Sequence, residues 1–264
     1  MFNDAELRRQ LPIGGYGMPL HFLASVGSTN DLAVDLAAGG APEGTLVVAD
    51  TQTRGRGRGE RLWQTKAGTA LAMSLVLRPR AIRPESAWGI SVVGALAVAE
   101  ALETEGAAPA IKWPNDVLVG GRKVAGLLVD ASWDGPRLES AVLGIGVNIL
   151  KGSAPPGAEV EFPATSLEES LGRPVDRGTL LLAILEALAR WVPRLGSAAL
   201  REAWWQRMAY RDGWVSVEDA GRFLRGRLVG LDAGGGVLLG LESGERVTVG
   251  VGAARLRPID KLSE

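Results

Sequence analysis

The chain has 264 residues, of which 46% are hydrophobic and 22% are charged, a composition typical of a globular protein rather than a disordered one. Its formal net charge of −1 gives no overall basic field, so we expect no binding to DNA. The absence of cysteine, with His21 as the one histidine, excludes cysteine nucleophiles and cysteine-based zinc or iron–sulfur sites.

Apolar periodicity and turn residues predict the elements of the first 150 residues. A short amphipathic helix is expected over residues 3–11, and a helix N-capped by Ser28 or Thr29 should run to about residue 38. Pro84 should open a long, Ala-rich, buried helix that reaches Leu102. Strands are expected over residues 21–26, 45–50, 70–77, 110–113, 117–119, 124–129 and 140–150.

The second half of the chain changes character after residue 210. Before that point we expect a loop rich in Gly and Pro over residues 151–164, then helices over 176–192 and 197–209. Beyond it, strands over 223–231, 237–241 and 246–251 alternate with glycine turns. These patterns predict an α+β fold, with a mixed β-sheet backed by helices over residues 1–210 and a small C-terminal β-barrel over 211–264.

The N-terminal residues lack the apolar stretch of a signal peptide, and the most apolar segment, residues 90–102, is too short to span a bilayer. We therefore expect a cytoplasmic protein without a membrane partner.

An arginine- and glycine-rich loop occupies residues 52–63. Glycines expose backbone N–H groups, and arginines add planar forks that match carboxylate and phosphate oxygens, so this loop suits anions. Taken alone, the loop fits a solvated basic segment, or one that contacts RNA, as well as it fits an anion-binding site. Its last residue, Trp63, could cover a purine ring or anchor the loop.

Two further motifs carry polar groups. Lys112 precedes a turn formed by Pro114, Asn115 and Asp116, so it is either a solvated charge at a strand edge or a cation held at a pocket. The Ser-Thr-Asn sequence of residues 28–30 stands at a helix start, where it is either a simple N-cap or a site for a small polar ligand.

Taken together, these motifs are specific. Residues 27–30, residues 52–63, Lys112 to Asp116 with 123–128, and 144–148 follow one another in an order and spacing that resembles the biotin–protein ligase family from about residue 20 to 150. The resemblance implies a catalytic domain like that of class II aminoacyl-tRNA synthetases and an SH3-like C-terminal barrel. About twenty residues precede the first motif, too few for the winged helix of members that repress transcription, so we expect a monofunctional enzyme.

The reaction implied by this resemblance has two steps. Biotin and ATP, with Mg²⁺, give biotinyl-5′-AMP and pyrophosphate, and a lysine of a biotin carboxyl carrier protein domain then takes the biotin and releases AMP. Whether the chain is a monomer or a homodimer stays open.

Residue roles follow from the same resemblance. Lys112 would bridge the biotin carboxylate and the α-phosphate, and Lys112 and Arg58 would be catalytic. No residue is expected to bind a metal. The biotin-binding residues would be Ser28, Thr29, Asn30, Gln52, Arg56, Gly57, Arg58, Lys112, Gly126, Gly144 and Gly146. The nucleotide-binding residues would be Gly55, Arg56, Arg58, Trp63, Lys112 and Asn148.

Four residues depart from the usual family pattern: Gly27, Arg54, and the adjacent Gly59 and Glu60. They bear on the shape of the empty loop more than on the reaction. Two other functions remain as alternatives, a lipoate–protein ligase and a non-enzymatic nucleic-acid-binding module.

Overall fold

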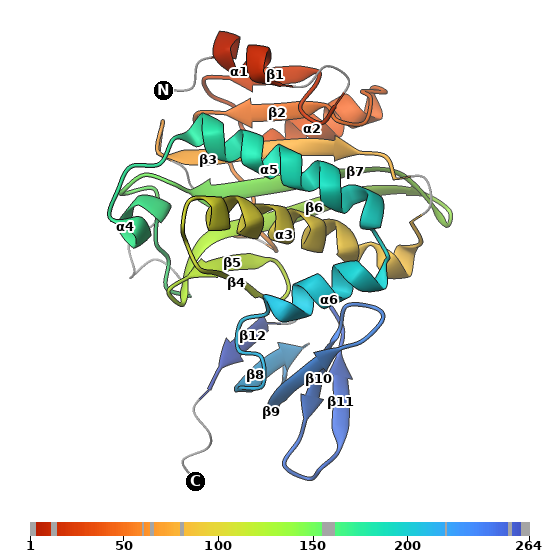
Figure 1. Cartoon of the computed structure of the whole chain (residues 1–264). Coiled ribbons are helices and arrows are strands. Elements are labelled where there is room, and N and C mark those ends of the chain that lie inside the picture. Colours follow the sequence, from red (N-terminus) through yellow and green to blue (C-terminus); the bar gives the residue numbers. More distant parts are fainter. Residues whose placement is uncertain are drawn as a thin grey trace.

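The computed structural model describes residues 4–11, 15–59, 61–63, 66–79, 82–154, 162–219, 221–252 and 255–259. They form two β-sheets, one of seven strands and one of five (Figure 1). The larger sheet has the order β1-β2-β3-β7-β6-β5-β4, parallel between β1 and β2 and antiparallel elsewhere, which confirms the predicted mixed sheet. Its strands are β1 (Leu20–Leu23), β2 (Leu46–Ala49), β3 (Ala70–Leu77), β4 (Pro109–Lys112), β5 (Asp116–Val119), β6 (Arg122–Asp134) and β7 (Arg137–Asn148).

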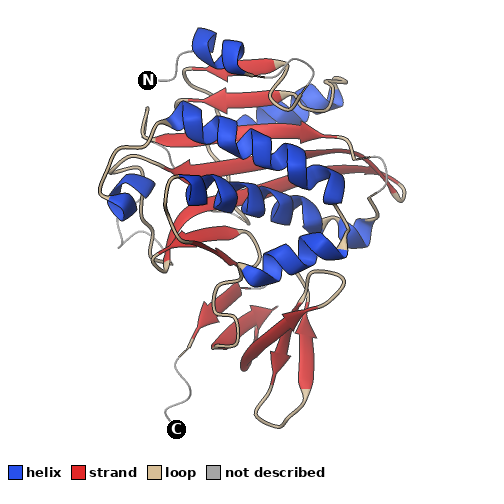
Figure 2. Ribbon diagram, viewed as in Figure 1, coloured by secondary structure: helices blue, strands red, loops and turns tan. Residues whose placement is uncertain are grey.

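Helices pack on both faces of the larger sheet. Two long helices, α3 and α5, cover one face (Figure 2) and enclose most of the apolar core. Helix α2 packs on the opposite face, where Ala33 and Ala37 meet Val47, Val76 and Val142. Because β3 is covered on both sides, every one of its residues is buried. The helices are α1 (Asp4–Gln10), α2 (Thr29–Ala38), η1 (Pro84–Ser86), α3 (Trp88–Thr104), α4 (Leu167–Leu171), α5 (Arg177–Trp191), η3 (Val192–Arg194) and α6 (Ala198–Gln206).

The structure corrects the predicted helices in two places. The long helix begins with a 3₁₀ turn at Pro84, and its α-helical part starts only at Trp88. Helix α4 was not predicted, although Ser166 and Glu169 form a capping box at its start.

The apolar segment of residues 90–102 lies within a longer helical stretch, Pro84–Thr104, which is long and apolar enough to cross a membrane by length and composition. Of the apolar 18-residue window of this stretch, however, 67% is buried inside the protein. Its packing in the core therefore accounts for its composition.

The five-stranded sheet contains β8 (Trp214–Asp219), β9 (Arg222–Leu231), β10 (Val237–Gly240), β11 (Arg246–Val249) and β12 (Arg255–Pro258), in the order β11-β10-β9-β8-β12. All of its pairings are antiparallel, consistent with the expected SH3-like barrel. The sequence prediction missed β8 and β12. Strand β12 has only four residues and pairs with β8, some forty residues earlier, a partnership that local sequence does not reveal.

The barrel is fixed to the edge of the larger sheet. Trp113 is fully buried, and its indole Nε1 donates a hydrogen bond of 3.0 Å to the carbonyl of Gly235 in the β9–β10 turn. Trp88 stacks on Trp204 with ring centroids 5.5 Å apart. On the β4 side, Ile111 exchanges backbone hydrogen bonds with the segment that follows α6. These contacts hold β12 beside the turn between β4 and β5.

The contact between Gly235 and Trp88 gives a test of this attachment. Gly235 has φ +77°, and a Cβ added there would lie 2.5 Å from the Trp88 ring. Gly244 has φ +85° but has open space around it, so it is a matched control for backbone strain alone. We expect Gly235→Ala to lower the free energy of unfolding in urea by about 1–3 kcal/mol more than Gly244→Ala does, since only the first overpacks a core ring. Equal losses in the two variants would contradict a packed Trp88–Gly235 contact.

Candidate active site

A cavity of about 650 Å³ opens on the face of the larger sheet that carries α2. The arginine- and glycine-rich loop, the N-terminus of α2, the turn after β4, strands β6 and β7, and β12 of the barrel all contribute to its wall. The cavity thus combines segments that are far apart in the sequence.

Almost every residue predicted for the site lines this cavity. They are Ser28, Thr29, Asn30, Gln52, Arg56, Gly57, Arg58, Trp63, Lys112, Gly126, Gly144, Gly146 and Asn148. Gly55 does not line it. A side chain at Gly55 would collide with the carbonyl of Trp63 and the side chain of Gln52, so this glycine allows two arms of the loop to approach each other.

The α2 end of the cavity is a polar subsite. Ser28 is the N-cap of α2, where its hydroxyl accepts from the Asp31 N–H. The backbone N–H and hydroxyl of Thr29 both donate to Gln52 Oε1, at 2.8 and 3.0 Å. Because Thr29 and Asn30 are only 3% and 4% exposed, their polar groups are largely removed from water and can select a hydrogen-bonding ligand.

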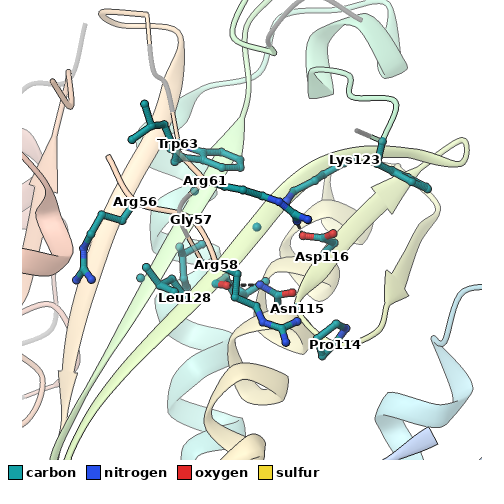
Figure 3. A pocket seen from close by; sticks show the side chains of 18 of the residues that line it. Arg56, Gly57, Arg58, Arg61, Trp63, Pro114, Asn115, Asp116, Lys123 and Leu128 are labelled. Carbon is teal, nitrogen blue, oxygen red and sulfur yellow. Dashed lines mark hydrogen bonds and ion pairs between the residues drawn. The ribbon is translucent and has the colours of Figure 1, made fainter. Parts of the chain in front are cut away.

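The opposite end of the cavity holds a cluster around Asp116. Its carboxylate lies 2.5 Å from Lys123 Nζ and 3.4 Å from Lys112 Nζ. The register of the β4–β5 hairpin pairs Lys112 directly with Asp116. Figure 3 shows Arg61 and Lys123 converging on Asp116. Sequence reasoning included Lys123 and Asp116 in motifs but gave them no role.

Burial and neighbouring charges have opposite effects on the pKa values of this cluster. Burial lowers the pKa of the Lys112 ammonium below the usual lysine value, and the charge of Asp116 offsets part of that effect. Burial alone would raise the pKa of Asp116, but the charges of Lys123 and Lys112 outweigh it, so this pKa lies below the usual aspartate value. Asp116 is therefore an anion that keeps two lysines in place.

The Trp63 indole packs against Gly126 and Gly146. A side chain at Gly146 would overlap the indole ring, and one at Gly126 would come within 3.2 Å of it. Lys123 Nζ lies 5.6 Å from the ring centroid. The Trp63 Nε1 is buried and finds no hydrogen-bond partner among the described residues. Trp63 thus covers two of the glycines predicted to bind biotin, Gly126 and Gly146.

Arg56 and Asn148 contact protein groups as well as the cavity. Arg56 forms ion pairs of 2.7 Å with both Asp31 and Asp130, and in Figure 3 it points away from Asp116 and Lys123. Asn148 is buried and donates a hydrogen bond of 3.2 Å to the carbonyl of Thr165. Both line the cavity, but the structure also gives each of them a scaffolding contact.

The barrel contributes cations that sequence reasoning missed. Arg58 from the loop donates to the carbonyls of Val251 and Gly252, and burial lowers the pKa of its guanidinium. Arg255 and Arg257 of β12 also line the cavity. Within the described part of the chain, Asp116 is the one carboxylate in its wall, and the cationic residues there are Arg56, Arg58, Arg61, Lys112, Lys123, Arg255 and Arg257. Such a cavity attracts a polyanion.

Comparisons with known proteins agree with this geometry. Residues 22–148 match the model of the biotin/lipoate A/B protein ligase family. The chain is 37% identical over 235 residues to the biotin–[acetyl-CoA-carboxylase] ligase of Paracoccus denitrificans, covering 85% of this chain and 95% of the relative. It is 38% identical over 184 residues to the bifunctional ligase/repressor BirA of Bacillus spizizenii, but this match spans only 56% of that protein's length.

A solved structure shows the same fold. The biotin protein ligase of Aquifex aeolicus in complex with biotin and ATP superposes with a TM-score of 0.77 at 31% identity, covering 92% of this chain and all of that one. The extent of these matches, together with the cavity, shows that the chain belongs to the biotin protein ligase family.

Proposed function

We propose that this protein activates biotin with ATP to biotinyl-5′-AMP and transfers the biotin to a lysine of a biotin carboxyl carrier domain. The observation that supports this proposal best is the largely buried Lys112 ammonium, which lines the same strongly cationic cavity as the polar subsite of Thr29, Asn30 and Gln52. The Paracoccus relative is named for ligation of biotin to acetyl-CoA carboxylase, and the Aquifex structure contains biotin and ATP.

The first step brings two anions together. A biotin carboxylate oxygen forms a bond to the α-phosphorus of ATP while the bond to the β-phosphate oxygen breaks, and pyrophosphate leaves. Lys112 supplies the cation that lies between carboxylate and phosphate in this proposal. Because it is preorganised and only 11% exposed in its side chain, its charge is weakly screened by water.

The second step uses the acyl adenylate. The uncharged amine of the acceptor lysine bonds to the carbonyl carbon, the carbon–oxygen bond to AMP breaks, and the amine gives its extra proton to solvent. Closure of the arginine- and glycine-rich loop would keep water from this anhydride. The polar head of biotin would bind to Thr29, Asn30 and Gln52, its rings would lie on Gly126, Gly144 and Gly146, and Trp63 and Asn148 would face the adenylate.

The barrel completes the phosphate end of the site in this proposal. Residues 1–210 would bind biotin and the nucleotide, and residues 211–264 would add Arg255 and Arg257 next to Arg58. The expected cytoplasmic location is part of the same proposal, since the reaction consumes ATP.

Magnesium would enter as MgATP. Asp116 is held by Lys112 and Lys123, and no group of three or more His, Asp or Glu side chains occurs in the described ranges. A small cation that prefers phosphate and water oxygens therefore fits the substrate better than a cage of protein ligands. We assign no residue of this chain to it.

A lipoate–protein ligase is the second candidate, because the matching family includes lipoate enzymes. The relatives and structures named above are biotin ligases, which favours biotin. The decisive experiment incubates the protein with ATP, a biotin carboxyl carrier domain, and either biotin or lipoate, and measures the acceptor mass. A mass gain with lipoate but not with biotin would overturn the proposal.

Lys112→Ala should reduce biotin-dependent pyrophosphate release by about a hundredfold or more, because a preorganised cation at a developing anion is removed. Lys151→Ala is the control, since Lys151 is exposed and outside the cavity wall. Circular dichroism should show an intact fold in both variants. Release at the wild-type rate from Lys112→Ala would exclude the assigned role.

The activity should also depend on pH in a way that identifies Lys112. Because burial lowers its pKa, the required ammonium loses its proton at a lower pH than an ordinary lysine does, so kcat/KM for adenylation should decline early on the alkaline side. In Lys112→Arg the guanidinium stays protonated, and the remaining activity should lack this decline. The measurement is the pH profile of both proteins. An alkaline decline at the same pH in both would assign the titration to another group.

Arg58→Ala should weaken retention of the adenylate. The substitution removes a guanidinium group that would bind the adenylate phosphate, and with it the contact with Val251 and Gly252 of the barrel. We expect adenylate dissociation to accelerate about tenfold or more, measured by trapping the released adenylate. Arg246→Ala, at an exposed position of β11 outside the cavity wall, is the matched control. Identical dissociation from the two variants would remove Arg58 from the site.

A further inference from the structure

A chain of polar contacts starts on the arginine- and glycine-rich loop and returns to it. Its first part runs from Gln52 through Thr29 to Ser74 on β3. The Ser74 hydroxyl lies 2.8 Å from Thr29 Oγ1 and 2.6 Å from Asn30 Oδ1, and its single proton can serve one of them at a time. Ser74 is fully buried, so it has no water to replace these partners.

The second part of the chain runs through Asp130 on β6. One oxygen of its carboxylate, Oδ2, accepts from Asn30 Nδ2 at 2.8 Å and from Arg56 Nη2 at 2.7 Å. A carboxylate only accepts hydrogen bonds, so it fixes the Asn30 amide with its nitrogen toward Asp130 and its oxygen toward Ser74. The missing side chain of Gly144 leaves room for this amide, because a Cβ there would overlap Asn30 Oδ1.

The third part brings the chain back to the loop at Arg56. Its Nε also contacts Asp31 at 2.7 Å, but the Asp31 side chain is 54% exposed, whereas that of Asp130 is 31% exposed. Exposed ion pairs contribute little, so Asp31 adds little to holding Arg56. Asp130 differs because its oxygen also serves the buried Asn30. Losing it would leave the amide nitrogen without its anchor.

From this geometry we propose that Asp130 is a positioning residue that couples the polar subsite of Thr29, Asn30 and Gln52 to the arginine- and glycine-rich loop through Asn30 and Arg56. This inference rests on the proposed function, since the polar subsite is the one assigned to the biotin head. Asp130 itself is absent from the cavity wall, so it acts through its two partners. A ligand that hydrogen-bonds to the subsite would then stabilise the closed loop, and a closed loop would stabilise the subsite.

The test compares Asp130→Asn with Asp31→Asn. An asparagine at position 130 keeps the size of the side chain but removes the charge and the fixed orientation of the Asn30 amide. We expect Asp130→Asn to raise the biotin KM and the adenylate dissociation rate at least tenfold while the ATP KM changes less than threefold. Asp31→Asn should change all three less than threefold, and Asp130→Glu should recover most of the loss.

Trypsin gives a readout that does not need catalysis, because the loop contains Arg54, Arg56, Arg58 and Arg61. In the empty protein, Asp130→Asn should be cut in the loop faster than wild type, with an unchanged melting temperature. If wild type shows no biotin-dependent adenylation, the proposed function fails, while faster cutting of Asp130→Asn still supports the contact between Asp130 and the loop.

Three results would overturn the inference: Asp130→Asn behaving like Asp31→Asn, a fall in kcat alone with unchanged biotin KM, or Asp130→Glu as defective as Asp130→Asn. Should Asp130→Asn fail to fold, Ser74→Ala loosens Asn30 from its other side. It should raise the biotin KM and the dissociation rate in the same way, and wild-type values for it would contradict the coupling.

Discussion

The attraction between Asp116 and the two lysines beside it is the constraint on which the site depends. The seven arginines and lysines that line the cavity repel one another, and their burial adds the free-energy cost of removing charged groups from water. Asp116 offsets this repulsion where it is strongest, at Lys112 and Lys123, and it remains charged because both lysines are within 3.4 Å. The polyanionic nucleotide of the proposed reaction would neutralise the remaining cations.

The scaffold explains how so many cations can be held in one place. The larger sheet is filled on one face by α3 and α5, which leaves the other face free for α2 and the cavity (Figures 1 and 2). The hydrogen bond from Trp113 to Gly235 fixes the barrel at the sheet edge, so that Arg255 and Arg257 reach a cavity built mostly from residues a hundred or more positions earlier. The role of the barrel at this site is therefore electrostatic as well as structural.

The arginine- and glycine-rich loop is held from two sides by contacts within the protein. Arg56 is paired with Asp31 and Asp130, and Arg58 contacts the barrel, whereas Trp63 rests on Gly126 and Gly146. In the proposed reaction, a ligand that enters has to displace or join Trp63, whose indole N–H has no hydrogen-bond partner among the described residues. The loop is thus shaped by contacts with the larger sheet, with α2 and with the barrel. The departure at Arg54 fits this picture, because its guanidinium lies over Gly27, where any side chain would come within 3.3 Å of it.

The amino-acid sequence predicted the mixed sheet, most helix and strand positions and many of the residues that meet at the cavity. Local periodicity predicts elements such as β3 and α2. The order of the motifs, through the family that they resemble, predicted that Ser28, Lys112 and Gly146 share one site. The pairing of charges, in contrast, follows from the three-dimensional arrangement of the elements. The same holds for strand β12, the barrel arginines and the contact of Asp130 with Arg56. They depend on residues separated by 37 to 74 positions or more, and no local pattern encodes such separations. Pairing across these distances follows from the packing of whole elements, which brings together side chains that short-range sequence signals leave independent.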